Sequence, residues 1–400
     1  MEILSERLKR FKPSLTVEIS QKARELTKQG KNIISLSSGE PDFDTPNHIK
    51  AEGINAINKG YTKYTPVDGI ISLKQAIVDK FKKDNGLLFK NNQVTVGVGG
   101  KHVIYNLFMS TLNKSDEVLI PSPYWVSYPD IVSLCGGKPV IIETKASDKF
   151  KITPDSLEKK VTPNTKWLII NSPSNPTGIV YSKKELRELS KILLKYDHIH
   201  ILSDDIYEHI LYDDQKFFNI VNVEPKLMKR TFIINGVSKA FSMTGWRIGF
   251  GVGDEKIIRA MSKIQSQSTT NPTSICQHAA VKALSAEKEF LNEWILQYSQ
   301  RRNYVCNFLD GIDSLSYVKP KGAFYLYISC EKLLNRRTPD KKKINDDVDF
   351  SNFLLEFANI AVVPGIAFGS SPYFRISYAA SMDLLKIACQ RMKKAVSLLK

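Results

Sequence analysis

Short apolar runs alternate with amphipathic stretches along most of this 400-residue chain. Apolar runs bounded by turn residues are typical of buried strands, and a period of 3.6 residues is typical of helices. The pattern predicts strands at 33–36, 93–96, 117–120, 139–143, 167–170, 200–207, 231–234, 318–328 and 373–378, and helices at 16–29, 47–59, 70–84, 182–196, 256–266, 287–311 and 347–359. Strands alternating with helices predict an α/β fold with a mainly parallel sheet, whose ligand lies at the carboxyl ends of the strands.

Composition is ordinary for a globular protein, with 42% hydrophobic and 24% charged residues, and 400 residues are enough for two domains. No apolar run is long enough to span a membrane, and the first residues lack the apolar segment of a secretory signal. The five cysteines are scattered and form no C-x-x-C pair, which favours neither disulfides nor zinc. We therefore expect a cytoplasmic protein with no membrane partner and no metal.

The formal net charge of +16 suggests nucleic-acid binding as an alternative function. The basic residues are spread along the chain, however, and the densest group, at 336–343, lies beside Asp340, Asp346 and Asp347. This pattern favours an exposed loop over a nucleic-acid patch, so we expect no nucleic-acid partner. A positive field also attracts phosphate and dicarboxylate ligands.

One lysine, Lys239, follows the apolar run 231–234 and sits among small residues, including Gly236 and Ser238. A lysine in a crowded pocket near another cation loses its proton readily and becomes a nucleophilic amine. Such amines form Schiff bases with carbonyls, of which pyridoxal phosphate is the common cofactor example. Arg247, eight residues later, would clamp the phosphate; the alternative is a lysine on an exposed loop.

A glycine turn at 97–100 opens a predicted helix after the strand 93–96. Free N–H groups at a helix N-terminus favour a phosphate. His102 stands where a dinucleotide fingerprint needs a small residue and where a Walker loop needs Ser or Thr, so both motifs are excluded.

Four more polar or aromatic side chains follow, end or interrupt predicted strands. Trp125 follows the strand 117–120 and would stack on a flat ring, although a core tryptophan fits equally well. Asp204 and Asp205 end another strand and suit a metal site, a catalytic pair or an anion beside a pyridine nitrogen. Arg375 interrupts an apolar strand, which is costly unless a carboxylate pairs with it or the strand lies at an exposed edge.

These motifs together resemble class I and II aminotransferases, most closely the bacterial aspartate aminotransferase branch (subgroup Ib). The likeness is carried by Gly-Glu-Pro-Asp-Phe at 39–43, Asn-Pro-Thr-Gly at 175–178 and Ser-Lys-Ala-Phe-Ser-Met-Thr-Gly-Trp-Arg-Ile-Gly at 238–249. It implies the fold type I of pyridoxal-phosphate enzymes: a mainly parallel seven-stranded sheet flanked by helices, with a smaller α+β domain. The expected division is 1–46 for the N-terminal arm and part of the small domain, 47–290 for the large cofactor-binding domain and 291–400 for the small domain.

The resemblance also implies roles for individual residues. Lys239 would be catalytic and bind the cofactor, with Asp204 at the ring nitrogen and Trp125 on the ring face. The remaining cofactor contacts would be Gly100, Lys101, Asn175, Tyr207 and Arg247, together with Tyr64 from the partner subunit of a homodimer. The substrate contacts would be Gly39, Lys101, Trp125, Asn175, Arg375 and Lys12.

The implied activity is transfer of the amino group between L-aspartate and 2-oxoglutarate. Lys101 is the cue for a dicarboxylate, and Lys12 is the cue for prephenate as a second substrate. An aromatic or alanine aminotransferase and a C–S β-lyase share the fold and the lysine, so they are alternatives.

Overall fold

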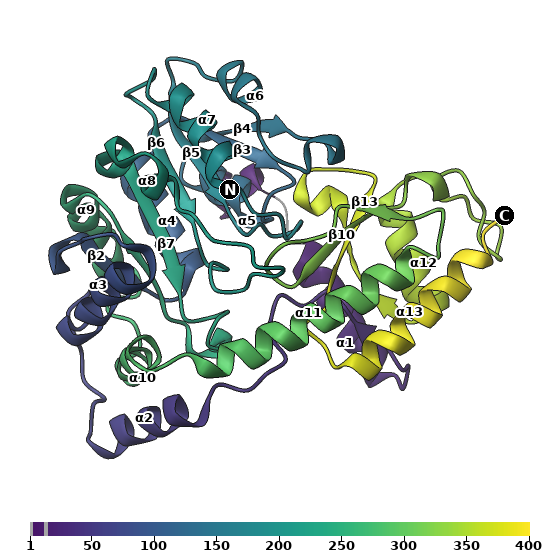
Figure 1. The fold of residues 1–400 in the computed structure, drawn as a ribbon, viewed down its shortest axis with the longest axis horizontal. Coiled ribbons are helices and arrows are strands. Elements are labelled where there is room, and N and C mark those ends of the chain that lie inside the picture. Colours follow the sequence, from purple (N-terminus) through teal and green to yellow (C-terminus); the bar gives the residue numbers. More distant parts are fainter. Residues whose placement is uncertain (1–2, 12–14) are drawn as a thin grey trace.

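The computed structural model describes residues 3–11 and 15–400. Its largest sheet has seven strands in the order β2-β8-β7-β6-β5-β3-β4 (Figure 1). The strands are β2 (Val94–Gly97), β3 (Glu117–Ser122), β4 (Lys138–Glu143), β5 (Thr165–Asn171), β6 (His200–Asp204), β7 (Thr231–Gly236) and β8 (Gly249–Val252). In this sheet β8 runs antiparallel to its two neighbours, β2 and β7, and the other neighbouring strands are parallel to each other. The sheet is therefore mainly parallel, as the sequence predicts.

Helices cover both faces of this sheet because successive strand residues point to opposite sides. In β5, Leu168 and Ile170 belong to a core shared with α3, α7 and α10. Trp167 and Ile169 belong to a second core with α4, α5 and α9. The helices are α2 (Asn47–Asn58), α3 (Ile71–Asn85), α4 (Gly100–Thr111), α5 (Ser127–Leu134), α6 (Pro154–Glu158), α7 (Lys183–Leu193), α8 (Ile220–Val223), α9 (Glu255–Ser266) and α10 (Ser274–Ser285).

A smaller lobe combines segments from both ends of the chain. Its antiparallel sheet has the order β12-β13-β10-β9, and β1 pairs in parallel with β11. The elements are β1 (Ile34–Ser35), β9 (Ser316–Tyr317), β10 (Tyr325–Ser329), β11 (Ile360–Ala361), β12 (Val363–Pro364), β13 (Tyr373–Ser377), α1 (Leu15–Lys28), α11 (Glu289–Leu309), α12 (Asp347–Ala358) and α13 (Met382–Ser397). The short 3-10 helix η1 (Glu6–Arg10) packs on α5 of the larger lobe.

The long helix α11 runs between the two lobes (Figure 1). Leu291, in its first turn, is buried in the core of the larger lobe. Val305 and Leu309, near its end, are buried in the core of the smaller lobe. Ile295 packs against both cores, so one continuous helix joins the lobes.

Most predicted elements are present with ends shifted by a few residues, but one strand is shorter than predicted, and helices α5, α10 and α13 were not predicted. Helix α10 was not predicted, because its buried face is built largely from Ala279, Ala280 and Ala283, which give a weak apolar pattern. The strand predicted at 318–328 begins only at Tyr325, because the preceding residues form a turn. The predicted domain boundaries fall at the start of α2 and in the first turn of α11, and they stay a prediction.

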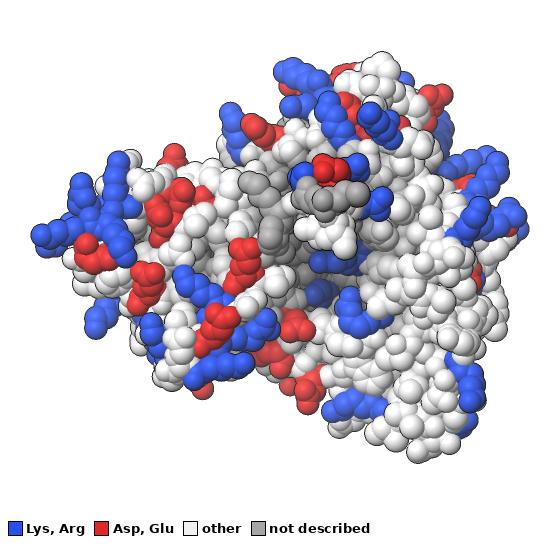
Figure 2. Space-filling view, turned by 180° about the vertical axis from the view of Figure 1, so that it is seen from behind, with Lys and Arg blue, Asp and Glu red and all other residues white. Residues whose placement is uncertain are grey.

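Among the described residues, no helix has the length and apolarity needed to cross a membrane. The basic side chains do not gather in a single region on the face shown in Figure 2, where Lys and Arg are interspersed with Asp and Glu. The predicted basic cluster around 336–343 forms a turn in which Lys342 pairs with Asp340 at 2.9 Å.

Candidate active site

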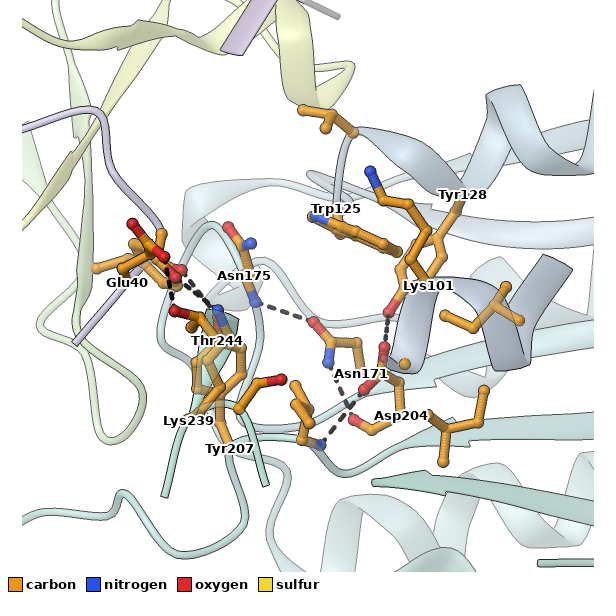
Figure 3. Close-up of a pocket in the computed structure, with 18 of the residues that line it drawn as sticks. Glu40, Lys101, Trp125, Tyr128, Asn171, Asn175, Asp204, Tyr207, Lys239 and Thr244 are labelled. Atoms are coloured by element: carbon orange, nitrogen blue, oxygen red, sulfur yellow. Dashed lines mark hydrogen bonds between the residues drawn. The ribbon is translucent and has the colours of Figure 1, made fainter. Parts of the chain in front are cut away.

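A cavity of about 360 Å³ lies at the carboxyl ends of the parallel strands, between the two lobes (Figure 3). Its volume is in the range of small-molecule sites. Ten of the twelve predicted site residues line it: Gly39, Gly100, Lys101, Trp125, Asn175, Asp204, Tyr207, Lys239, Arg247 and Arg375. The strand-end motifs therefore meet as expected for a parallel sheet.

Lys239 follows β7 and points into the cavity (Figure 3). Its Nζ donates to the carbonyl of Gly39 at 2.5 Å. Burial lowers the pKa of Lys239 to about 8; nearby Glu40 raises it, whereas Arg375 and Arg247 lower it further. An amine with this pKa is neutral in a far larger fraction near physiological pH than an ordinary lysine, and the neutral form is the one that acts as a nucleophile or base.

Asp204 ends β6 on the floor of the cavity and is 6% exposed. Its Oδ2 accepts a hydrogen bond from the Tyr128 hydroxyl at 2.6 Å, and its Oδ1 accepts one from the Ile206 N–H at 3.3 Å. Burial raises the pKa of Asp204, while the Tyr128 hydrogen bond opposes that rise. Within residues 3–11 and 15–400 no side chain forms an ion pair with Asp204, although the more distant charge of Lys239 lowers its pKa somewhat. A positive charge from a ligand would therefore relieve its burial.

The neighbouring acid, Asp205, faces away from the cavity. Its carboxylate accepts from the Ser203 hydroxyl at 2.7 Å and from the Asn219 amide at 2.5 Å. Burial raises the pKa of Asp205 to about 8. Because Asp204 and Asp205 have separate partners, the arrangement does not support a paired-acid or metal site at this strand end.

An amide chain connects Asp204 to the arginine of the smaller lobe. Asn171 donates through Nδ2 to the Asp204 carbonyl at 3.0 Å and accepts from the Asn175 N–H at 2.9 Å. Arg375 then donates from Nη1 to Asn175 Oδ1 at 2.9 Å and from Nη2 to the Ser37 carbonyl at 2.7 Å. These hydrogen bonds fix the smaller lobe relative to the floor of the cavity.

Arg375 is 2% exposed, and its guanidinium lies 4.5 Å from the centre of the Tyr325 ring. Burial lowers the pKa of Arg375. Its Nε is buried and has no hydrogen-bond partner among the residues that the structure describes. A buried cation with a free donor favours an anionic ligand such as a carboxylate, rather than an edge strand facing water.

The other end of the cavity suits a phosphate. Helix α4 begins at Gly100 after Gly99, which has φ +81° and no side chain to cap the first N–H groups. A Cβ at Gly99 would lie 2.8 Å from Cζ of Arg247, so only glycine lets the guanidinium approach the helix. Arg247 donates to the Thr244 carbonyl at 2.9 Å and to the Val98 carbonyl at 3.2 Å, which orients it beside these N–H groups.

Lys101 and Trp125 lie together at the cavity wall, with Nζ 5.1 Å from the centre of the indole ring (Figure 3). Burial lowers the pKa of Lys101 and Arg247 lowers it further, while Asp130 raises it. Trp125 is thus a cavity residue and not part of a closed core.

Residues 31–392 match the family model described as "Aminotransferase class I and II". The chain belongs to the class I and II aminotransferases. The predicted family, the type I fold and the enzyme class are thereby confirmed, and the cofactor of this aminotransferase is pyridoxal 5′-phosphate.

Individual relatives cover nearly the whole aminotransferase chain. A probable aspartate/prephenate aminotransferase of Rickettsia typhi is 51% identical over 100% of both chains. The aspartate/prephenate aminotransferase of Cereibacter sphaeroides is 49% identical over 98% of both. Among solved structures, the aspartate aminotransferase of Rhizobium meliloti has a TM-score of 0.97 at 46% identity, covering 100% of both chains. That of Thermus thermophilus with maleate has a TM-score of 0.92 at 39% identity, covering 99% of this chain and 100% of the other.

The cavity residues of this aminotransferase fit pyridoxal phosphate. Asp204, a buried carboxylate with no ion-pair partner in the part of the chain that the structure describes, suits a protonated ring nitrogen. The amine of Lys239 suits the aldehyde, and the glycine turn with Arg247 suits the phosphate.

Two predicted site residues lie elsewhere in the aminotransferase. Tyr64 is 91% exposed and does not line the cavity of its own chain. Lys12 falls outside the described residues. The polar segment 266–272 contributes no residue to this cavity either.

Sequence reasoning also missed residues that line the cavity. Tyr128 lies one helical turn after Trp125, and Asn171 pairs with Asp204 across neighbouring strand ends, so both had a readable signal. Tyr325 gave no such signal, because it comes from β10 of the smaller lobe. Glu40 and Thr244, which share a hydrogen bond of 2.6 Å beside Lys239, were likewise not singled out (Figure 3).

Proposed function

We propose that this protein is an aspartate aminotransferase, which exchanges the amino group between L-aspartate and 2-oxoglutarate and forms oxaloacetate and L-glutamate. The observation that carries the proposal is the single cavity in which Lys239, Asp204 and Arg375 meet. The names of the relatives at about half identity support the choice of aspartate within the family.

The roles proposed for the side chains follow from their surroundings. Bound pyridoxal phosphate supplies an aldehyde that condenses with amines and a ring that, when protonated, withdraws electrons from the substrate Cα. The Lys239 amine, once released, is basic enough to take the proton from Cα and to return a proton later. Asp204 holds the proton on the ring nitrogen, since it is an anion buried without another cation.

Substrate selection rests on two cations. Arg375 would pair with the α-carboxylate through its planar fork, because its Nε donor is free. Lys101, at the cavity wall, would pair with the second carboxylate of aspartate or glutamate. The binding of maleate, a dicarboxylate, by the Thermus thermophilus relative supports this choice.

Prephenate is the second candidate substrate. The names of the Rickettsia typhi and Cereibacter sphaeroides relatives include it, which favours it over a substrate with a single carboxylate. Prephenate also carries two carboxylates, so Lys101 and Arg375 would serve it as they serve aspartate. The product would be arogenate.

The proposed working form is a homodimer in the cytoplasm. Several of the large apolar or aromatic side chains left exposed lie in the segment from the second half of α2 to the first residue of α3: Ile54, Ile57, Tyr61, Tyr64 and Ile71. Clustered exposed apolar side chains favour an interface. A second copy of the chain covering this segment would place Tyr64 at the partner's cofactor phosphate.

An amino-donor screen tests the proposal. Purified protein with pyridoxal phosphate should use aspartate with 2-oxoglutarate far better than alanine or phenylalanine, and prephenate should accept an amino group from glutamate or aspartate. Lys239→Ala should abolish turnover, whereas Lys256→Ala, on the exposed side of α9, should not. Pyruvate release from cystathionine without transamination of aspartate would instead identify a C–S β-lyase.

A further inference from the structure

The loop at 61–70, which connects α2 to α3, holds Tyr64 at the surface, while the backbone at both of its ends is hydrogen-bonded to the rest of the chain. We propose that Gln277, on α10, is a positioning residue for the cofactor site of the neighbouring subunit. It acts by holding this loop so that Tyr64 projects toward that subunit. The inference rests on the proposed homodimer, which it extends to a residue that touches neither cofactor nor substrate.

Gln277 is fully buried, at 0% exposure. Its Oε1 accepts from the Ile70 N–H at 2.8 Å, at the end of the loop. Its Nε2 donates to the Thr65 hydroxyl at 3.0 Å, next to Tyr64, and to the Pro272 carbonyl at 2.8 Å. One amide therefore fastens the loop at two points and joins it to the exposed segment 266–272.

Neighbouring residues reinforce the same arrangement. Gln265, 1% exposed, donates to the carbonyls of Val67 at 2.6 Å and Val96 at 3.0 Å. Ser274 donates to the Tyr61 carbonyl at 2.7 Å, and the His278 ring stacks on Tyr61 with centres 4.2 Å apart. The backbone of the loop is thus held at both ends by α9, α10 and β2.

Against this fixed backbone, Tyr64 stands out with 91% exposure. The hydrogen bonds satisfy buried backbone groups of the loop, and they also fix where Tyr64 is presented. For binding, a rigid loop reduces the conformational entropy that is lost when the contact forms. The arrangement therefore fits a tyrosine that is oriented in advance for a site on another subunit.

A buried amide that merely stabilises its own chain would predict something different. Loss of Gln277 would then weaken the site of the same chain, or the fold as a whole. On the proposed role, its loss weakens the site of the other chain. Mixed dimers separate these outcomes, because the substitution can be placed on either chain.

Each mixed dimer contains one chain with Lys239 and one chain with Lys239→Ala, carrying different affinity tags for purification. Gln277→Leu is placed either on the Lys239→Ala chain or on the chain that keeps Lys239. Only the latter chain can hold pyridoxal phosphate covalently. Borohydride reduction across a pyridoxal phosphate titration, followed by mass spectrometry, therefore reports cofactor occupancy at that one site.

We expect an increase of about ten-fold in the apparent dissociation constant for pyridoxal phosphate when Gln277→Leu lies on the Lys239→Ala chain, which corresponds to one lost hydrogen bond to a charged group. The same substitution on the chain with Lys239 should leave it unchanged. Thr65→Val removes only the loop's hydroxyl acceptor, so it should act in the same direction even if Gln277→Leu folds poorly. Gln75→Leu, exposed on α3, is the matched control and should act in neither position.

An effect that follows the chain carrying Lys239, or one that is equal in both arrangements, would overturn the proposed role of Gln277. Monomers at assay concentrations would overturn it too, together with the shared site. Turnover by the Lys239→Ala homodimer would instead refute the proposed catalytic function, so the two failures are distinguishable.

Discussion

The buried acid at the cavity floor offers a demanding test, because one substitution should move activity and stability in opposite directions. Asp204→Asn keeps the shape of the side chain and removes its charge. A pair of opposite charges about 4 Å apart at an effective dielectric of about 20 is worth about 4 kcal/mol. Losing it would lower the pKa of the cofactor's ring nitrogen by about three units and slow turnover by about 10³-fold.

In the cofactor-free protein the same change should be tolerated. The amide can still accept the 2.6 Å hydrogen bond from Tyr128, and it loses only the 3.3 Å bond from the Ile206 N–H. The folded-state pKa of Asp204 is raised above its ordinary value of 3.8, so the folded state holds this proton more tightly than the unfolded state. Wild-type stability from this group is therefore complete below pH 3.8 and is lost as pH rises through the folded pKa.

The assay compares thermal unfolding of both cofactor-free proteins at about pH 5 and about pH 8, along with steady-state rates for aspartate. The stability of Asp204→Asn relative to wild type should be more favourable at the higher pH, while its kcat falls. A variant that loses stability as pH rises, relative to wild type, would refute the assigned pKa direction. A variant with normal kcat would refute the role of Asp204 as the partner of the ring nitrogen.

Three further outcomes follow from the same cavity. Lys101→Ala should lower kcat/KM for aspartate by about ten-fold, through the loss of one charged contact, and leave the rate with alanine unchanged; equal losses for both donors would contradict the dicarboxylate role. Arg375→Lys should lower kcat/KM for every amino acid by about 10- to 100-fold, because an ammonium cannot form the two parallel hydrogen bonds of a guanidinium. An unchanged KM for the amino-acid substrates would contradict the pairing of Arg375 with the α-carboxylate. His102 accepts the Val98 N–H at 3.1 Å through Nδ1, and burial lowers its pKa below 6.5, so its contribution to stability is present above pH 6.5 and is lost as pH falls through the folded pKa. The unfolding temperature of His102→Gln should therefore fall less than that of wild type between about pH 7 and about pH 5.

The strand-end residues were predictable because a parallel sheet places the carboxyl ends of its strands at one edge. Asp204 and Lys239 follow adjacent strands, β6 and β7, and needed only that rule to be brought near each other. The direction of the Lys239 pKa was also predictable from small neighbours and a nearby arginine. Burial proves to be its largest cause, and Glu40, which opposes it, was not foreseen.

Contacts across the lobes were harder to predict. Arg375 stood out as a charge in an apolar strand, but its neighbour Tyr325 depends on how β10 and β13 pair and on where the smaller lobe docks. A single sequence does not show which residues of two distant strands lie opposite each other. Helix α10 escaped notice for a different reason, since alanines bury a face without producing a strong apolar period.

Helix α11 has a mechanical consequence. Its 21 residues span about 30 Å, and a continuous helix resists bending. One end of the helix is embedded in each core. Since each residue adds about 1.5 Å of length, a tilt of about 5° at the first turn moves the last turn by about 3 Å. A sub-ångström adjustment near Leu291 would therefore be amplified along α11 into a displacement of several ångströms at the smaller lobe, which carries Arg375.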